Sequence, residues 1–356
     1  MSGALIAMSG GVDSSVAALL AVERGLDSIG GMMKLFDSED LVGGRADSCR
    51  ALDDAEDARA VANKLGIQFY VFNFANVFRE MVIEKFVEAY QNGETPNPCV
   101  DCNRYLKFGQ LLRRAKELGK EYVVTGHYAR IERGAGGGRL LLKKGADLSK
   151  DQSYVLYSMT QEQLGATLFP LGGLCKEQVR EMAMERGFGN AKKGESQDIC
   201  FVREGSYADF ILRHTGKEFP GGRFVDKDGR DLGGHKGIVH YTVGQRRGLG
   251  LAAGSPLYVC GINAGNNSVV VGHESDLYSK TLIAKDANLI PVDRLDTALK
   301  ARVRIRYNQQ EQPATVWQLD AGTLRIEFDS PQKAVTKGQA AVIYDGDVVV
   351  GGGTIS

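Results

Sequence analysis

The chain of 356 residues has little of what marks several protein classes. Its six cysteines are too few for the disulfide framework of a small secreted protein. Eight prolines against 45 glycines indicate tight turns and close backbone approaches rather than a low-complexity tail. Lys and Arg number 44, as do Asp and Glu, so overall charge gives no sign of a nucleic-acid partner, although a locally basic face is not excluded.

Long hydrophobic runs are also missing. The N-terminus, MSGALIAMSGG, has no basic region before its short apolar stretch, and nowhere do about 18 apolar residues run together. We therefore expect a cytoplasmic protein with no membrane partner. With 43% hydrophobic and 25% charged residues the composition is globular, and the length indicates two or three domains.

The first third of the chain alternates between short apolar runs and helical spacing. This alternation predicts βαβ units and a parallel sheet, and hence an α/β fold class. The expected strands are 4–8, 28–33, 68–74 and 121–125, and the expected helices are 14–23, 53–65 and 77–90. Later segments predict helices at 161–164 and 176–187. From about residue 219 onward, short strands separated by Gly, Asp and Asn turns predict a small β-barrel or sandwich.

The strongest local signal is Ser9-Gly10-Gly11-Val12-Asp13-Ser14-Ser15, between the first expected strand and the first helix. Two glycines let the backbone approach a ligand closely, and the helix N-terminus offers free amides to a phosphate. The string has no lysine of a Walker loop and is not a dinucleotide fingerprint. It matches the SGGxDS signature of the PP-loop ATP pyrophosphatases. The plain alternative is a βα turn capped by Ser and Asp.

A second signal is Cys99-Val100-Asp101-Cys102, in a proline-rich loop before a helix expected to start near Arg104. The helix dipole there predicts a lowered thiol pKa and a reactive sulfur. Half of a structural zinc site, or two inert buried thiols, are the alternatives. No second C-x-x-C or H-x₃₋₅-H exists to complete a zinc site.

Several further strings occur in one order over nearly the whole chain, and together they resemble the tRNA-specific 2-thiouridylases. They are Ser9–Ser15, Thr95-Pro96-Asn97-Pro98 with Cys102-Asn103, Thr125-Gly126-His127-Tyr128, Lys150-Asp151-Gln152-Ser153-Tyr154, Asp198-Ile199-Cys200-Phe201 and Gly244-Gln245-Arg246-Arg247-Gly248-Leu249-Gly250. The resemblance implies a PP-loop ATP-binding catalytic domain over 1–205, a central domain over 206–280 and a C-terminal β-barrel over 281–356.

The resemblance also implies the reaction. ATP adenylates the 2-oxygen of the wobble uridine of tRNA, and sulfur from a cysteine persulfide then displaces AMP. The implied catalytic residues are Cys200, which receives the persulfide from a cysteine desulfurase or sulfur relay protein, and Cys102, which completes sulfur release through a transient disulfide. Lys192 and Lys193 are candidates for the local positive charge that favours thiolate; a solvated surface pair is equally consistent with the sequence.

Binding residues follow from the same resemblance. ATP binding is expected at Ala7, Met8, Ser9, Gly10, Gly11, Val12, Asp13, Ser14, Met33 and Gly126, with Asp13 a candidate for organising Mg²⁺. For Met33 a core role is the alternative, and for His127 a structural hydrogen bond is as consistent as a general base. Contacts with tRNA are expected at Asn97, Pro98, Cys99, Lys150, Asp151, Gln152, Arg306 and Tyr307. Arg302, Arg304 and Arg306 alternate along an expected strand, which predicts a basic stripe on one face, and ordinary solvated charge is the alternative.

Cys99 departs from the better-known family pattern, in which Asp occupies the matching position. Either Cys99 is an alternative acid, base or resolving thiol, or Cys99, Cys102 and Cys200 hold a 4Fe-4S cluster. We favour the persulfide route over the cluster. Two other function classes remain: a PP-loop ligase that adenylates a small molecule, and a non-catalytic RNA-binding protein with a zinc staple.

Overall fold

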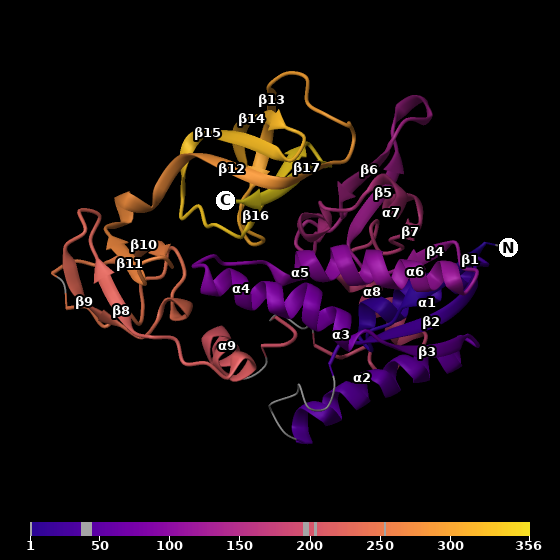
Figure 1. Ribbon diagram of the computed structural model, residues 1–356. Coiled ribbons are helices and arrows are strands. Elements are labelled where there is room, and N and C mark those ends of the chain that lie inside the picture. Colours follow the sequence, from indigo (N-terminus) through magenta and orange to yellow (C-terminus); the bar gives the residue numbers. More distant parts are fainter. Residues whose placement is uncertain (1, 37–44, 195–198, 203–204, 253) are drawn as a thin grey trace.

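The computed structural model describes residues 2–36, 45–194, 199–202, 205–252 and 254–356, without the side chains of 45–52. Figure 1 shows an α/β body, a small β-rich body at β8–β11 and a barrel at β12–β17. Asp198 of the predicted Cys200 motif lies outside the described residues.

The α/β body is built on the predicted parallel sheet. Its strand order is β3-β2-β1-β4-β7, and every neighbouring pair runs parallel. The strands are β1 (Gly3–Ala7), β2 (Asp27–Lys34), β3 (Gln68–Asn73), β4 (Tyr122–Val124) and β7 (Thr167–Leu168). β1 lies in the middle, so the loop that follows it emerges at the centre of the sheet edge.

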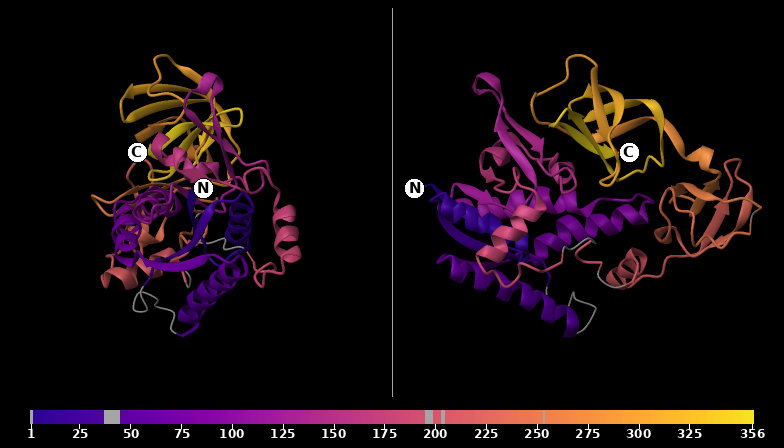
Figure 2. Two further views of the ribbon diagram at one scale, coloured as in Figure 1. Left: turned by 90° about the vertical axis from the view of Figure 1, so that its right-hand side faces the viewer. Right: turned by 180° about the vertical axis from the view of Figure 1, so that it is seen from behind.

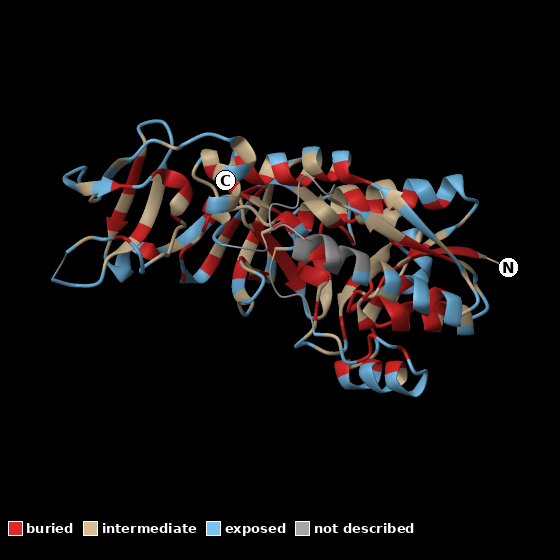
Figure 3. Cartoon of the chain, turned by 90° about the horizontal axis from the view of Figure 1, so that it is seen from below, coloured by how far each residue is buried: buried red, intermediate tan, exposed pale blue. Residues whose placement is uncertain are grey.

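Alternate residues of β1 face the two layers that cover the sheet, as a strand's period of two requires. Ala4 and Ile6 pack against α1 (Val12–Glu23), α2 (Arg45–Lys64) and α8 (Lys176–Glu185). Leu5 packs against the opposite helical layer, where Phe78, Phe86 and Leu111 are buried. Figure 3 shows the same division, with buried residues on strands and inner helix faces.

The second helical layer consists of two long helical runs. The first joins α3 (Ala75–Phe78), a π-helical segment (Arg79–Glu84) and α4 (Lys85–Gln91), which confirms the predicted helix. The second joins α5 (Pro98–Asp101), a π-helical segment (Cys102–Gln110) and α6 (Leu111–Glu117).

The predicted start of the second run near Arg104 is wrong. Pro98 takes the first helical position, where its missing N–H costs nothing, and the Asn97 side chain accepts the backbone N–H of Cys99 at 3.1 Å. The cysteine pair therefore lies inside the helix rather than before it.

The small β-rich body follows the helix α9 (Tyr207–Thr215). Its sheet has the order β10-β11-β8-β9 and is mixed, because β11 and β8 run parallel. Phe224, Val259 and Val269 lie in its small core. The strands are β8 (Gly222–Val225), β9 (Asp231–His235), β10 (Tyr258–Asn263) and β11 (Ser268–Gly272).

The predicted barrel is present, and the ring closes because its first strand, β12, pairs with both β15 and β17. Around the ring the order is β12-β15-β14-β13-β16-β17. These strands are β12 (Tyr278–Leu289), β13 (Leu299–Arg304), β14 (Gln312–Asp320), β15 (Thr323–Lys333), β16 (Ala340–Asp345) and β17 (Val348–Ile355).

A hairpin of the α/β body extends this barrel sheet. The strands β5 (Ala129–Arg133) and β6 (Leu140–Lys144) form this hairpin, and Leu142 and Lys143 of β6 pair with Val349 and Val348 of β17. Residues of the first predicted domain thus help to fix the position of the last.

The loop between α4 and α5 lies where the three bodies meet. The backbone N–H of Thr95 donates to the carbonyl of Lys337 at 2.8 Å, and Gln339 Nε2 donates to the carbonyl of Thr95. A side chain at Gly93 would lie 2.7 Å from Ile262 of β10. In Figure 1 and in the reverse view of Figure 2, the barrel lies above α4 and α5 and the β8–β11 body lies beyond the end of α4.

Candidate functional site

The loop from Ser9 to Ser14 connects β1 to α1 and is held by hydrogen bonds within itself. The backbone N–H of Ser9 donates to Ser14 Oγ at 3.1 Å, and Ser14 Oγ donates to the carbonyl of Gly11 at 2.9 Å. Gly10 adopts φ +75°, and a side chain there would lie 2.3 Å from the carbonyl oxygen of Asp54. Glycine is therefore required at this turn, and α1 begins with its N-terminus at the loop.

Asp13, in the first turn of α1, has two partners from other elements. Lys176 Nζ lies 2.8 Å from both Oδ1 and Oδ2, and the hydroxyl of Tyr128 donates to Oδ1 at 2.8 Å. Lys176 is the first residue of α8 and is buried. Sequence reasoning missed Lys176, because it lies 163 residues from Asp13 in the chain.

The loop has a second set of partners that the sequence gave no reason to select. Asn190 is buried and its Nδ2 donates to the carbonyl of Gly10 and to Ser15 Oγ, both at 2.9 Å. Its Oδ1 has no hydrogen-bond partner in the described part of the chain. Lys193 Nζ lies 2.6 Å from a carboxylate oxygen of Asp54 and of Asp57, so Lys193 lies at this loop, and Lys192 is exposed.

The other predicted nucleotide residues lie around the same edge. Met8 is buried, and Met33 near the end of β2 is half-buried against the core, so its core role is confirmed while nucleotide contact stays a prediction. Gly126 is required by packing: a side chain there would lie 2.8 Å from the carbonyl carbon of Asp13. The segment after β4 thus contacts the start of α1 directly.

His127 is buried with both ring nitrogens engaged. Lys107 Nζ lies 3.3 Å from Nε2, and Thr125 Oγ1 lies 2.7 Å from Nδ1. An ammonium group has no acceptor, so Nε2 accepts and Nδ1 carries the proton that is donated to Thr125. Burial, together with Lys107, holds the pKa of His127 well below its usual value. The ring is a neutral structural group in this state, which favours the structural alternative over a general base.

The pKa values of Cys99 and Cys102 are shifted in the same direction. Loss of hydration raises the pKa of both thiols, although the Cys99 side chain keeps solvent contact. The charge of Lys107 opposes this rise at both sulfurs. The predicted lowering of the thiol pKa by a helix dipole is therefore wrong in this structure, because desolvation outweighs it.

Cys200 is exposed and lies in a turn, and the next residue, Phe201, packs into the core. The ring of Phe201 is buried and meets the rings of Phe78 and Phe86 edge-on at 5.8 and 5.1 Å. This same core cluster contacts Cys102, Ile199 and Val202, and on its other side Leu5 and Ala7 of the strand that leads into the Ser9–Ser14 loop.

No disulfide joins any two of the described cysteines. Within the described ranges no group of three or more His, Cys, Asp or Glu side chains is arranged to hold a metal ion, so Cys99, Cys102 and Cys200 do not form such a set here. No described helix is both long and apolar enough to cross a membrane.

The two segments predicted to meet tRNA converge. The hydroxyl of Tyr307 donates to the carbonyl of Asp151 at 3.3 Å. The Asp151 side chain is buried, accepts from Gly145 N, Ser153 N and Ser153 Oγ, and lies 3.6 Å from Arg304. Gln152 Oε1 accepts the backbone N–H of Tyr128 at 3.0 Å. The side chains of Asp151 and Gln152 are therefore engaged in holding the fold.

The predicted basic stripe is largely paired within the protein. Arg302 and Arg304 both contact Glu311, which confirms that they share a face of β13. Arg306 lies beyond the end of that strand, and its Nη2 donates to the carbonyls of Val243 and Ala334 and to Thr336 Oγ1. Arg306 thus joins the β8–β11 body to the barrel.

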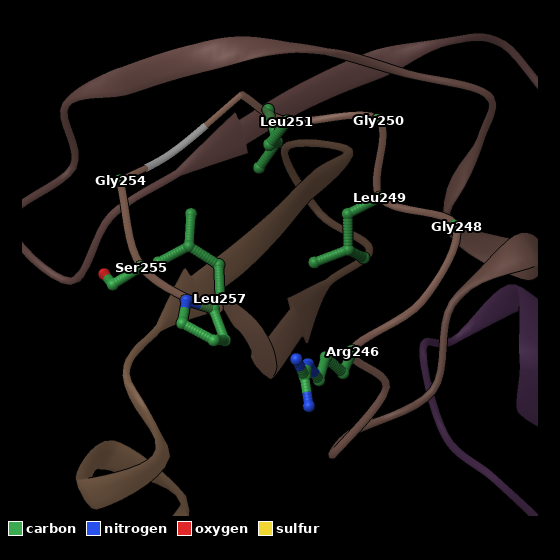
Figure 4. Close-up of a pocket in the computed structure, with 9 residues that line it drawn as sticks. Arg246, Gly248, Leu249, Gly250, Leu251, Gly254, Ser255 and Leu257 are labelled. Carbon is green, nitrogen blue, oxygen red and sulfur yellow. The ribbon is translucent and has the colours of Figure 1, made fainter.

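A separate hollow of about 400 Å³ lies in the β8–β11 body (Figure 4). It belongs to the Gly244–Gly250 string, and Figure 4 shows Arg246 across the hollow from Leu251. Its lining residues all come from one stretch of chain, namely Arg246, Gly248, Leu249, Gly250, Leu251, Gly254, Ser255, Pro256 and Leu257.

Comparison with known proteins agrees with this layout. Three family models match: a tRNA methyl transferase HUP domain over residues 3–204, a tRNA methyl transferase PRC-barrel domain over 208–273 and an aminomethyltransferase beta-barrel domain over 279–355. Among solved structures, a 4-thiouridine synthetase–RNA complex with bound ATP is similar at 16% identity and a TM-score of 0.35, covering 56% of this chain and 44% of that one. That likeness is too weak to support an argument.

Full-length relatives are much more similar. The tRNA-specific 2-thiouridylase MnmA of Clostridioides difficile (strain 630) is 50% identical over 354 residues, covering 99% of this chain and 97% of the relative. The tRNA-specific 2-thiouridylase MnmA 1 of Thermoanaerobacter sp. (strain X514) is 49% identical over 352 residues, with 99% and 97% covered. On this similarity along its whole length, the chain belongs to the tRNA-specific 2-thiouridylase family.

Proposed function

We propose that this chain is an enzyme that replaces the 2-oxygen of the wobble uridine of tRNA by sulfur at the expense of ATP. One observation carries the proposal: a single core cluster contacts the strand leading into the Ser9–Ser14 loop, Cys102 and the residues flanking Cys200. An activating site and two sulfur groups are thereby supported by the same packed layer, as a reaction of two coupled steps requires.

In the first step the 2-oxygen of uridine attacks the α-phosphorus of ATP, and pyrophosphate leaves. The amides at the start of α1 and the turn at Gly10 are suited to hold the phosphates. His127 is neutral and already donates and accepts, so it is not the base of this step. The 2-oxygen is itself nucleophilic, so little proton transfer is needed.

In the second step the terminal sulfur of a Cys200 persulfide attacks carbon 2 of the uridine ring, and AMP leaves. Thiolate from Cys102 then attacks Cys200 Sγ, which releases the thiolated base and leaves a Cys102–Cys200 disulfide for an external thiol to reduce. Lys107, rather than Lys192 or Lys193, is the cation that acts on Cys102. Persulfide comes from a sulfur-donor protein, and Cys200 is exposed as this delivery requires.

Two inorganic groups, Mg²⁺ and an iron–sulfur cluster, bear on this reaction. Mg²⁺ would neutralise charge on the departing pyrophosphate and would arrive with ATP. Asp13 does not fit as its ligand, because both carboxylate oxygens already accept from Lys176. An iron–sulfur cluster does not fit either, since the three thiols are not gathered. Cys99 is then left for an acid–base or resolving role in place of the usual Asp.

For tRNA, we propose contact at the junction of Lys150–Gln152 with Arg306–Tyr307 and at the Asn97–Cys99 turn. Chemistry at carbon 2 needs the base out of its stack, and the loop between α4 and α5 lies where all three bodies meet. Backbone groups, Lys150, Tyr307 and the remaining edge of Arg306 are the candidates, because Asp151 and Gln152 are engaged. Because ATP and tRNA are its substrates, we propose that the reaction takes place in the cytoplasm.

The test is thiolation of unmodified tRNA by the purified protein, with ATP, and with or without a persulfide donor. We expect 2-thiouridine only when tRNA, ATP and the donor are all present. Pyrophosphate release should require tRNA. Release driven by a small molecule without tRNA would instead support a PP-loop ligase, and thiolation without ATP would overturn the proposal.

A further inference from the structure

Lys176 occupies a position that is unfavourable for a lysine in two ways. It is the first residue of α8, where the helix dipole disfavours a cation, and its side chain is only 4% exposed. A buried ammonium group needs a compensating partner. A neutral pair of similar volume would be as stable or more stable, so the lysine calls for an explanation beyond stability.

The partner of this ammonium is the acidic residue of the nucleotide loop. Lys176 Nζ lies 2.8 Å from each oxygen of Asp13, and the hydroxyl of Tyr128 fixes Oδ1 from a third element. The two members differ in exposure: Asp13 is 31% exposed and Lys176 is 4% exposed. The carboxylate therefore lies between the ammonium and the open side of the site.

This arrangement addresses an electrostatic conflict in the loop. The N-terminus of α1 attracts anions, yet Asp13 places a negative charge in its first turn. An uncompensated carboxylate there would repel the phosphates of ATP, and the loop itself contains no lysine.

We propose that Lys176 is a positioning residue of the nucleotide site, which cancels the charge of Asp13 and fixes its carboxylate so that the loop accepts a polyphosphate. The proposal rests on the proposed function in that the polyphosphate is ATP. In this proposal the partner of the Asp13 carboxylate is the ammonium group of Lys176 and not a metal ion.

The experiment measures the dissociation constants of a non-hydrolysable ATP analogue, AMP and adenosine by calorimetry, with metal chelated and then with Mg²⁺ added. In Lys176→Met the affinity for the analogue should fall at least about tenfold, since one uncompensated charge acts on several phosphate charges. The loss should be smaller for AMP and absent for adenosine. Lys116→Met is the matched control, because Lys116 lies on α6 and forms an exposed ion pair with Glu162.

Two further variants separate charge from structure. Asp13→Asn combined with Lys176→Met restores a neutral pair and should bring analogue binding back to within severalfold of the wild type. Asp13→Asn alone should leave it unchanged or tighter. Three results would each overturn the proposal. Lys176→Met could lose affinity equally for all three ligands, or it could lose none. Asp13→Asn could lose affinity for the analogue only when Mg²⁺ is present.

If Lys176→Met does not fold, as judged by its melting curve, Lys176→Arg and the double variant carry the test. Lys176→Arg keeps the charge and should bind the analogue within severalfold of the wild type, and a tenfold loss in the folded variant would count against the proposal. A wild-type protein that binds none of the three ligands would refute ATP use itself, which is a different outcome.

Discussion

The Ser9–Ser14 loop, proposed here as the nucleotide loop, and the helical run from Pro98 that contains Cys99 and Cys102, here called the cysteine helix, belong to the same α/β body. Their charged side chains differ in how completely they are paired. At the loop each charged side chain has a close opposite partner, as Lys176 has Asp13 and Lys193 has Asp54 and Asp57. At the cysteine helix, burial raises the pKa of Asp101 to about 6 against the partial opposition of Lys85 and Arg104. Both thiols there also have raised pKa values.

The difference indicates what each region is built to do. A loop that is held by internal hydrogen bonds and is charge-balanced is preorganised, so little rearrangement would be needed for it to bind the proposed phosphates. Thiols with raised pKa values stay protonated and unreactive until a cation or a substrate changes their surroundings. The predictions below test the two regions in turn, from the largest expected effect to the smallest.

Cys200→Ser should abolish thiolation while leaving ATP-dependent activation of tRNA intact. The hydroxyl cannot carry a persulfide, but Cys200 lies in an exposed turn and is not part of the Ser9–Ser14 loop. Mass spectrometry after incubation with the donor measures persulfide on the protein, and pyrophosphate release measures activation. Donor-derived persulfide on the variant, at Cys102 or elsewhere, would refute the assignment of Cys200 as acceptor.

Gly126→Ala should slow tRNA-dependent pyrophosphate release by on the order of tenfold to a hundredfold, because a side chain would push on the backbone of Asp13 and Ser14 and misplace the start of α1. Gly173→Ala is the control, since nothing lies within 4 Å of a side chain there. Equal rates for the two variants would show that the loop tolerates displacement.

Lys107→Met should shift the reactivity of Cys102 to higher pH. The charge of Lys107 lowers the thiol pKa, so its removal raises that pKa, and the thiolate fraction at a given pH falls. The measurement is the pH profile of iodoacetamide alkylation at Cys102. Lys85→Met is the matched control, because Lys85 lies over the ring of Tyr105 and acts on Asp101. A profile that moves equally in both variants would contradict a specific role for Lys107.

Much of this layout could be predicted from the sequence, because it is local. The alternation of strands and helices, the β1–α1 turn and the strand-rich C-terminus all follow from spacing and turn residues. The helix with Cys99 and Cys102 begins at Pro98 rather than near Arg104, because proline is favoured at the first helical position and does not only mark a loop.

The parts that could not be predicted depend on long-range contacts. Lys176 and Asn190 approach the nucleotide loop from elements more than 160 residues away, and no motif links them to it. The sequence predicts a lowered pKa for the Cys102 thiol, whereas burial raises it, and the extent of burial cannot be derived from a single sequence. The sequence predicts that Arg306 contacts tRNA but gives no sign of the three protein acceptors to which it donates in the structure.

Asp101→Asn should stabilise the protein at pH 7.5 by about 1–3 kcal/mol. The folded protein holds a proton on Asp101 up to about pH 6, above the usual value of 3.8, so its stability falls as pH rises through this interval. The variant removes that penalty and should differ little from the wild type near pH 4. Chemical denaturation at both pH values measures the free energies. A variant less stable at pH 7.5 would show that Lys85 and Arg104 compensate the carboxylate fully.

Arg306→Ala should have the smallest effect and tests whether the junction of bodies is also an RNA surface. Nη2 donates to Val243, Ala334 and Thr336, whereas Nε and Nη1 form no hydrogen bond or ion pair with the described residues. If these nitrogens reach a phosphate, tRNA affinity should fall severalfold, and the slope of log affinity against log salt should become shallower by about 0.7–0.9. Arg302→Ala is the control, because Arg302 lies on the preceding strand, β13, and is paired with Glu311. A lower melting temperature with an unchanged slope would restrict Arg306 to joining the two bodies, where its charge is held by neutral acceptors.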